Sequence, residues 1–225
     1  MYRNERGFAF MTKKTAKKPV AKTWKDRLRI SVIFPFIVTF FGFTGMAASV
    51  VINIEKEDLL LHPKTVLVCD LNPIYSCANV ITSKQSKTLG ISNELFGIAM
   101  FGGIAAVGMT LIAGAQPKKW FWQLFMGGMA AFTLTTVYLW YQSVYTIGSL
   151  CIFCSSVWFS GWAITTSLYA QTYDQLLYKK VPKELSSLLK WIRNNILLVW
   201  FCGILLLTLL TLKHFWYYYG PHFGF

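Results

Sequence analysis

The chain has 225 residues, of which 55% are hydrophobic and 17% aromatic, while only 14% are charged. Together with a positive mean hydropathy of +0.45, this composition excludes an ordinary soluble globular domain and favours a lipid bilayer as the solvent. The formal net charge of +13 would suit a nucleic-acid-binding protein. Because the basic residues lie outside the apolar segments, we expect no nucleic-acid partner.

Apolar runs long enough to cross a membrane recur along the chain. A helix needs about 20 residues to span the hydrocarbon core. Runs of this length without alternating polarity do not suit the strands of a barrel. We therefore predict an all-α membrane protein with one helical bundle. The predicted spans are residues 30–54, 95–114, 120–141, 150–170 and 196–213.

A basic segment, residues 1–29, precedes the first span. We expect a disordered tail, parts of which contact anionic membrane lipid. The apolar core of the first span has about 25 residues, against about 7 to 15 in a signal peptide, and no small-x-small cleavage site ends it. We therefore expect a retained helix. Met11 is an alternative start.

Lysine and arginine are divided unequally between the two sides of the predicted bundle. Ten precede the first span, two follow the second and five lie between the fourth and fifth, so the split is 17 against 5. By the positive-inside rule, the N-terminus is cytoplasmic and the loop 55–92 lies outside. Five acidic residues, Glu94 among them, leave the outer side nearly neutral.

Cys69 and Cys77 lie in the outer loop. Asn72 followed by Pro73 is typical of a helix N-terminus, so we predict a short helix that starts there and carries Cys77. Cys69 would then be exposed in the mobile segment before it. One exposed and one held thiol suit a shuttle between a protein partner and an acceptor disulfide. A static disulfide that stabilises the loop is the alternative.

Cys151 and Cys154 form a Cys-x-x-Cys motif at the outer end of the fourth span. Ser149 is the predicted N-cap, so first-turn amides would favour a thiolate at Cys151. Spacing of three places both sulfurs on one face, close enough to cycle between dithiol and disulfide. Structural zinc sites use the same spacing, but they normally add a second close pair, so we expect no metal site. Inert structural thiols are the other alternative.

The remaining features are interpreted as packing. Cys202 is a lone cysteine within an apolar run and is expected to act as a small hydrophobic residue. Small faces that let helices approach closely are offered by Gly42, Gly45, Gly97, Gly102, Gly103, Gly108, Gly127 and Gly128. No phosphate loop, nucleotide fingerprint or histidine cluster occurs.

Several of these motifs, over roughly residues 30–170, resemble the vitamin K epoxide reductase family, specifically its bacterial disulfide-forming branch. The elements that carry the resemblance are Cys69-Asp70, Ser76-Cys77, Ser83, Asn93-Glu94-Leu95-Phe96-Gly97 and Cys151-x-x-Cys154. The resemblance implies a four-helix bundle around a quinone (menaquinone or ubiquinone), with a fifth helix that in many bacterial members leads to a thioredoxin-like domain. Because this sequence stops at Phe225, we expect a separate DsbA-like thioredoxin-fold protein to supply the substrate thiols.

The resemblance also implies catalytic roles for the four cysteines. Cys69 would take electrons from the partner, and Cys77 would relay them to Cys151. Cys154 would be the thiolate that faces the quinone ring. Each transfer would proceed by thiolate attack through a mixed disulfide.

The same resemblance indicates quinone-binding residues. Asn93 matches an asparagine that hydrogen-bonds a quinone carbonyl, and Ser83 matches a serine or threonine near the cysteines. Trp158 stands where vertebrate members have a quinone-bonding tyrosine; an indole lacks the acidity and acceptor capacity of a phenol, so we expect quinone rather than epoxide reduction. Phe96 flanks the site. Each residue has an alternative role: Asn93 as a helix cap and Ser83 as a plain loop residue. Trp158 could instead be a membrane-interface anchor and Phe96 a core aromatic.

The predicted function is that of a membrane thiol-disulfide oxidoreductase that oxidises an extracytoplasmic thioredoxin-fold partner, passes two electrons to a quinone and supports disulfide bond formation. We expect it in the bacterial cytoplasmic (inner) membrane, with its cysteines at the outer face. The alternatives are a vitamin K-type quinone or epoxide reductase and a non-catalytic scaffold with structural disulfides. The predicted divisions are a tail (1–29), a catalytic four-helix domain (30–170), a cytoplasmic linker (171–195) and a fifth helix with a short outer tail (196–225).

Overall fold

The computed structural model describes residues 31–87, 90–172 and 183–219. The predicted basic tail lies outside the described residues, as does part of the predicted linker. The elements are α2 (Ile33–Leu61), α3 (Cys77–Thr82), the 3₁₀ turn η1 (Lys84–Lys87), α4 (Asn93–Ile112), α5 (Lys119–Tyr141), the π-helical turn η2 (Gln142–Ile147), α6 (Ile152–Thr172), α7 (Lys183–Asn194), α8 (Ile196–His214) and α9 (Trp216–Tyr219).

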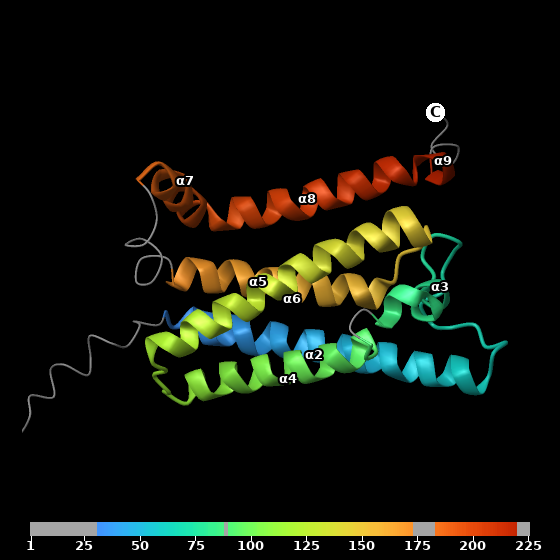
Figure 1. The fold of residues 1–225 in the computed structure, drawn as a ribbon, viewed down its shortest axis with the longest axis horizontal. Helices are drawn as coiled ribbons and strands as arrows, with labels where there is room; N and C mark the ends of the chain where they lie inside the picture. The colour runs from blue at the N-terminus through green and yellow to red at the C-terminus, as the bar shows by residue number, and fades with distance from the viewer. Residues whose placement is uncertain (1–30, 88–89, 173–182, 220–225) are drawn as a thin grey trace, which may run out of the picture.

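The long helices run side by side in one bundle (Figure 1). Close packing joins α2 to α4 and α6, and joins α6 to α5 and α8. Small residues permit the closest approach, since a Cβ added to Gly42 of α2 would lie 2.8 Å from the backbone nitrogen of Ala105 in α4. Helix α3 and the outer loop lie at one end of the bundle, and α7 lies at the other (Figure 1).

Four helical segments of the described chain are long and apolar enough to cross a membrane. They are α2, α4, α5 continued through η2 (Lys119–Ile147), and α8. The protein is therefore an all-α, multi-pass membrane protein, as the sequence predicts.

Helix α6, which the sequence predicts as a further span, has 21 residues but is not among these four. Serine and threonine lower its hydropathy. Their hydroxyls donate to carbonyls one turn back in the same helix, as Ser156 does to Ile152 and Ser160 to Ser156. These hydroxyls are therefore satisfied within α6 itself, which packs against α2, α5 and α8.

The buried side chains form separate clusters along the bundle. One lies among the helices and includes Phe34, Val38, Phe101 and Trp122. Another lies at the end that carries α3, and three cysteines belong to it, together with apolar side chains of α2, α3 and the loop: Ile52, Leu67, Cys69, Cys77, Ile81 and Cys151. The bundle thus places sulfur in a packed core at one end.

Candidate active site

Cys69 and Cys77 form a disulfide that is buried, with exposed fractions of 2% and 1%. The prediction that Cys69 is exposed is therefore wrong. The segment before it alternates, so that Val66 and Val68 are exposed while Leu67 and Cys69 face the core. A turn over residues 67–70, in which the Asp70 N–H donates to the Leu67 carbonyl at 3.0 Å, places Cys69 against the core.

The short helix α3 begins at Cys77, later than predicted. The Asn72 side chain does not cap a helix; its Oδ1 accepts the N–H groups two and three residues ahead, at 3.0 and 2.8 Å, which closes a turn. Tyr75 then pairs with Leu150 in a parallel bridge. Only after this extended residue does Ser76 cap α3 by accepting the N–H three residues ahead. Cys77 is consequently the first helical residue.

Cys151 precedes the first residue of α6 and occupies the position that the sequence assigned to Ser149. The backbone N–H of Cys154 donates to Cys151 Sγ at 3.3 Å, whereas Ser149 accepts from Asn79 of α3 at 3.0 Å. An N–H of the first turn of α6 therefore points at the Cys151 sulfur. The helix N-terminus thus favours a thiolate at Cys151.

The sulfur of Cys151 lies between the disulfide and Cys154. Its Sγ is 3.2 Å from Cys77 Sγ, so a movement of about 1 Å would give the S–S bond length of about 2.05 Å. Cys151 is fully buried, whereas Cys154 is partly exposed and reaches the wall of a cavity. The geometry permits exchange between the two pairs through Cys77 and Cys151.

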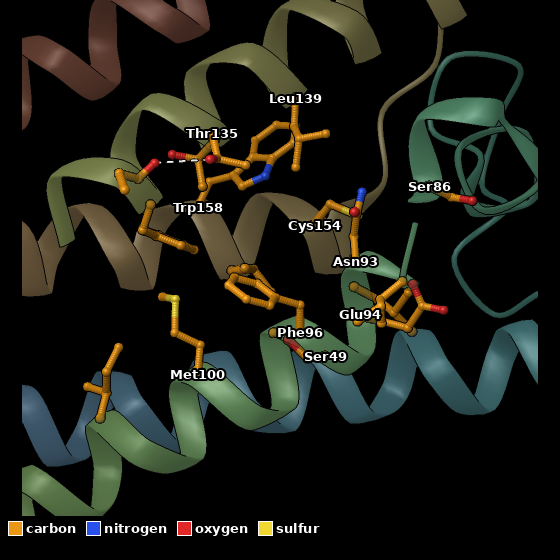
Figure 2. A pocket seen from close by; sticks show the side chains of 18 of the residues that line it. Ser49, Ser86, Asn93, Glu94, Phe96, Met100, Thr135, Leu139, Cys154 and Trp158 are labelled. Carbon is orange, nitrogen blue, oxygen red and sulfur yellow. Dashed lines mark hydrogen bonds between the residues drawn. The ribbon is translucent and has the colours of Figure 1, made fainter. Parts of the chain in front are cut away.

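The cavity beyond Cys154 has a volume of about 800 Å³ and is lined mainly by apolar side chains of α4, α5 and α6 and of the segment before α4. All four predicted quinone-binding residues line it, namely Ser83, Asn93, Phe96 and Trp158. Figure 2 shows side chains from α4 and α6 projecting into this space. In that view Trp158 lies towards Thr135 and Leu139 of α5.

Two of these residues also have structural hydrogen bonds. Asn93 Nδ2 donates to the carbonyl of Gln85 at 2.8 Å, which holds η1 close to the start of α4. Ser83 Oγ donates to the carbonyl of Val80 at 2.7 Å. Asn93 therefore both lines the cavity and holds η1 in place, and Ser83 lines the cavity just before η1.

The sequence did not predict one ion pair at the cavity. Both of its residues were interpreted only as charges on the outer side of the membrane. Lys56 Nζ lies 2.7 Å from Glu94 Oε1, and the two side chains are 14% and 4% exposed. Glu94 lines the cavity beside Asn93. A carboxylate in the first turn of an apolar span is costly unless paired, which is the signal that could have identified it.

A quinone fits the residues present. Pockets of about 300 to 1,000 Å³ with apolar walls and a few polar groups suit small organic ligands. The apolar wall matches a ring and its tail, and the Asn93 amide is a donor for a carbonyl oxygen. Among the described residues, no group of three or more His, Cys, Asp or Glu could hold a metal ion.

Comparison with known families gives a match over this region. The model of the vitamin K epoxide reductase family matches residues 36–169. That range is more than half of the chain, and it contains all four paired cysteines and every cavity residue discussed above. A comparison with curated proteins found no match.

Proposed function

Since the chain belongs to the vitamin K epoxide reductase family, we propose that it is a thiol-disulfide oxidoreductase that oxidises a DsbA-like thioredoxin-fold partner and passes the electrons to a quinone. Family membership and the spans make it a multi-pass membrane redox enzyme that acts on a quinone or an epoxide. The observation that carries the finer proposal is the sulfur arrangement: Cys77 is 3.2 Å from Cys151, and Cys154 lines an apolar cavity.

The first half-reaction transfers two electrons from the partner to Cys69 and Cys77. A partner thiolate attacks Cys69 and releases Cys77 as a thiolate. The second partner thiol then attacks the mixed disulfide, so the partner leaves as a disulfide and Cys69 becomes a thiol. Because Cys69 is 2% exposed, this exchange requires the segment around Val66 and Val68 to move.

The second exchange carries the electrons inward. The Cys77 thiolate attacks Cys151 of a Cys151–Cys154 disulfide and releases Cys154. Cys69 then attacks Cys77, which restores the Cys69–Cys77 disulfide and leaves Cys151 and Cys154 as thiols. Cys151 is a good leaving group in this last step because the Cys154 N–H donates to its sulfur. The product has the same sulfur bonding as the described structure.

The cavity is where the electrons would leave the protein. Menaquinone or ubiquinone bound there would accept two electrons and two protons from the dithiol. Asn93 would donate to a carbonyl oxygen, Ser83 would lie near it, and Phe96 and Trp158 would contact the ring. The indole of Trp158 offers one donor and no acidic hydroxyl, which favours quinone reduction over epoxide reduction.

We place the protein in the bacterial cytoplasmic membrane, with its N-terminus in the cytoplasm and α3 on the outer side. The basic residues of the sequence support this orientation. Helix α7, which follows the fourth predicted span, lies at the bundle end opposite α3 (Figure 1). Residues 30–170 would form the catalytic domain, 171–195 a cytoplasmic linker and 196–225 a fifth membrane helix with a short outer tail.

Reconstitution tests this function. Protein in vesicles would be given reduced DsbA-like partner with menaquinone, ubiquinone or neither. We expect partner oxidation that depends on quinone. A partner that keeps only its attacking cysteine should stay joined to Cys69 as a mixed disulfide, with Cys77 released as a thiol. Partner oxidation at the same rate with and without quinone would contradict the proposal. Product analysis with an epoxide substrate would show whether the protein reduces an epoxide instead.

A further inference from the structure

The ion pair between Lys56 and Glu94 joins α2 to the first turn of α4 at the wall of the cavity. Glu94 is in the first turn of α4, and its side chain is 4% exposed. Lys56 comes from α2, 38 positions away in sequence, and also donates to Ser92 Oγ at 2.9 Å. Buried ion pairs are often no more stabilising than well-packed apolar residues. A costly pair at a cavity wall is therefore a candidate for function.

Few groups at the cavity can exchange a proton. Among the described residues that line it, Glu94 and Cys154 are the ones with ionisable side chains; the others are apolar or carry amides, hydroxyls or an indole. Quinone reduction consumes two protons as well as two electrons. When Cys154 reacts as a thiolate, it has no proton to give. Proton transfer then needs another group within reach.

We propose that Glu94 is a catalytic proton donor for the quinone-reducing step and that Lys56 stabilises the carboxylate left after donation. This inference rests on the proposed function. The O–H bond of the Glu94 carboxylic acid breaks as an O–H bond forms on the acceptor, and the ion pair of the described structure is the state after donation. Lys56 is the more exposed partner, at 14%, and marks the route by which water at the outer face reprotonates Glu94.

The step balances. Cys151 and Cys154 lose two electrons and two protons as their disulfide forms, and the bound quinone becomes a quinol. Glu94 supplies one of the two protons of the quinol, and water supplies the other. The protons of Cys151 and Cys154 leave to water and balance the one that Glu94 later regains and the one that water supplies. The net reaction is dithiol and quinone to disulfide and quinol.

Glu94→Gln tests the proposal when the two half-reactions are measured separately in vesicles with menaquinone. We expect re-oxidation of the Cys151–Cys154 dithiol to slow by roughly 10²-fold, the scale of general acid catalysis. Thiol exchange with the partner in the absence of quinone should stay within about twofold, which also reports correct folding. Glu57→Gln is the matched control, because Glu57 is on α2 and accepts a hydrogen bond from Asn53 at an exposed site.

A double variant separates proton transfer from charge balance. Lys56→Gln with Glu94→Gln removes both charges together, so a purely electrostatic role predicts recovery of the rate. Our proposal predicts that the quinone step stays slow and that Glu94→Asp restores part of it. A normal rate in Glu94→Gln, or recovery in the double variant, would overturn the assignment while leaving the proposed function in place.

A spectroscopic readout is independent of turnover. The infrared difference spectrum between oxidised and reduced protein with menaquinone bound should contain a carboxyl C=O band from Glu94. We expect the band in wild type and in Glu57→Gln and its loss in Glu94→Gln. An unchanged band in Glu94→Gln would contradict proton exchange at this residue. Absence of quinone-dependent oxidation in wild type would instead remove the proposed function itself.

Discussion

The outer end of the bundle and the cavity beside it are filled in opposite ways. Around Cys69, Cys77 and Cys151 the side chains pack until the sulfurs are at most 2% exposed. Beyond Cys154 the bundle instead leaves about 800 Å³ open. Thiol-disulfide exchange needs sulfurs in contact, whereas a second substrate needs space. Cys154 is the residue at which the two requirements meet.

Glycine has opposite effects on the α2–α4 face and at the cavity. On the α2–α4 face, a Cβ at Gly45 would overlap the ring of Phe101, and a Cβ at Gly108 would lie 2.7 Å from the nitrogen of Thr39. On the cavity side, a Cβ at Gly103 or Gly128 would meet nothing within 4 Å. The same small residue therefore brings helices together in one place and leaves room in another.

The largest expected effect comes from cutting the link between the two regions. Cys154→Ser should reduce quinone-dependent turnover to the uncatalysed background, because no thiol then reaches the cavity. Cys151 should still attack Cys77, so a Cys77–Cys151 disulfide should accumulate and be found by peptide mass spectrometry. Retained turnover in this variant would show that electrons leave by another route.

Close packing on the α2–α4 face can be broken by one methyl group. Gly45→Ala should lower the free energy of unfolding by about 1–3 kcal/mol, because the added Cβ must displace Phe101. Gly102→Ala is the control, since its Cβ would lie at an ordinary 3.5 Å from Met46 Sδ. Thermal unfolding in detergent measures both. Equal stability of the two variants would contradict the described packing.

A larger side chain in the cavity should leave the fold stable but weaken quinone binding. Gly128→Leu places a side chain into the open space, so we expect KM for quinone to rise about tenfold, or about 1.4 kcal/mol, with little change in thermal stability. Gly127→Leu is a close control, because Gly127 has equally open surroundings and is not among the cavity-lining residues. An equal rise in both would place the quinone elsewhere.

The smallest effect is expected at the remaining cysteine. Cys202 is exposed on α8 and belongs to neither region. Cys202→Ser should leave partner oxidation and quinone reduction within about twofold of wild type. A large loss would mean that the two pairs do not account for the redox chemistry.

The sequence predicted the bundle and the grouping of the cysteines well, because both depend on local properties. A long apolar run forms a helix in lipid whatever surrounds it, and α4 at Asn93–Ile112 begins and ends within two residues of its predicted span. The family motifs also gave the cavity residues Ser83, Asn93, Phe96 and Trp158. Their chemical roles stay predictions.

What the sequence missed depends on contacts between distant segments. Asn72 closes a turn instead of capping a helix because Tyr75 pairs with Leu150. Ser149 is not the N-cap because Asn79 takes its hydroxyl as a partner. No local pattern brings these segments together.

The same limit hides the buried charges. Lys56 and Glu94 are 38 residues apart, and only the α2–α4 packing brings them to 2.7 Å. In sequence each resembles an ordinary outer-loop charge. The size of the cavity cannot be read from the sequence either, because it depends on how the helices that line it pack together.

The most direct test of the sulfur relay follows the oxidation state of each pair in time. Protein with both pairs oxidised would be mixed with reduced partner, quenched with an alkylating reagent and mapped by mass spectrometry. We predict that, without quinone, Cys151 and Cys154 become alkylated while the Cys69–Cys77 disulfide re-forms, and that adding quinone restores the Cys151–Cys154 disulfide. Electrons that stay on Cys69 and Cys77, or a Cys151–Cys154 pair that does not respond to quinone, would contradict the relay.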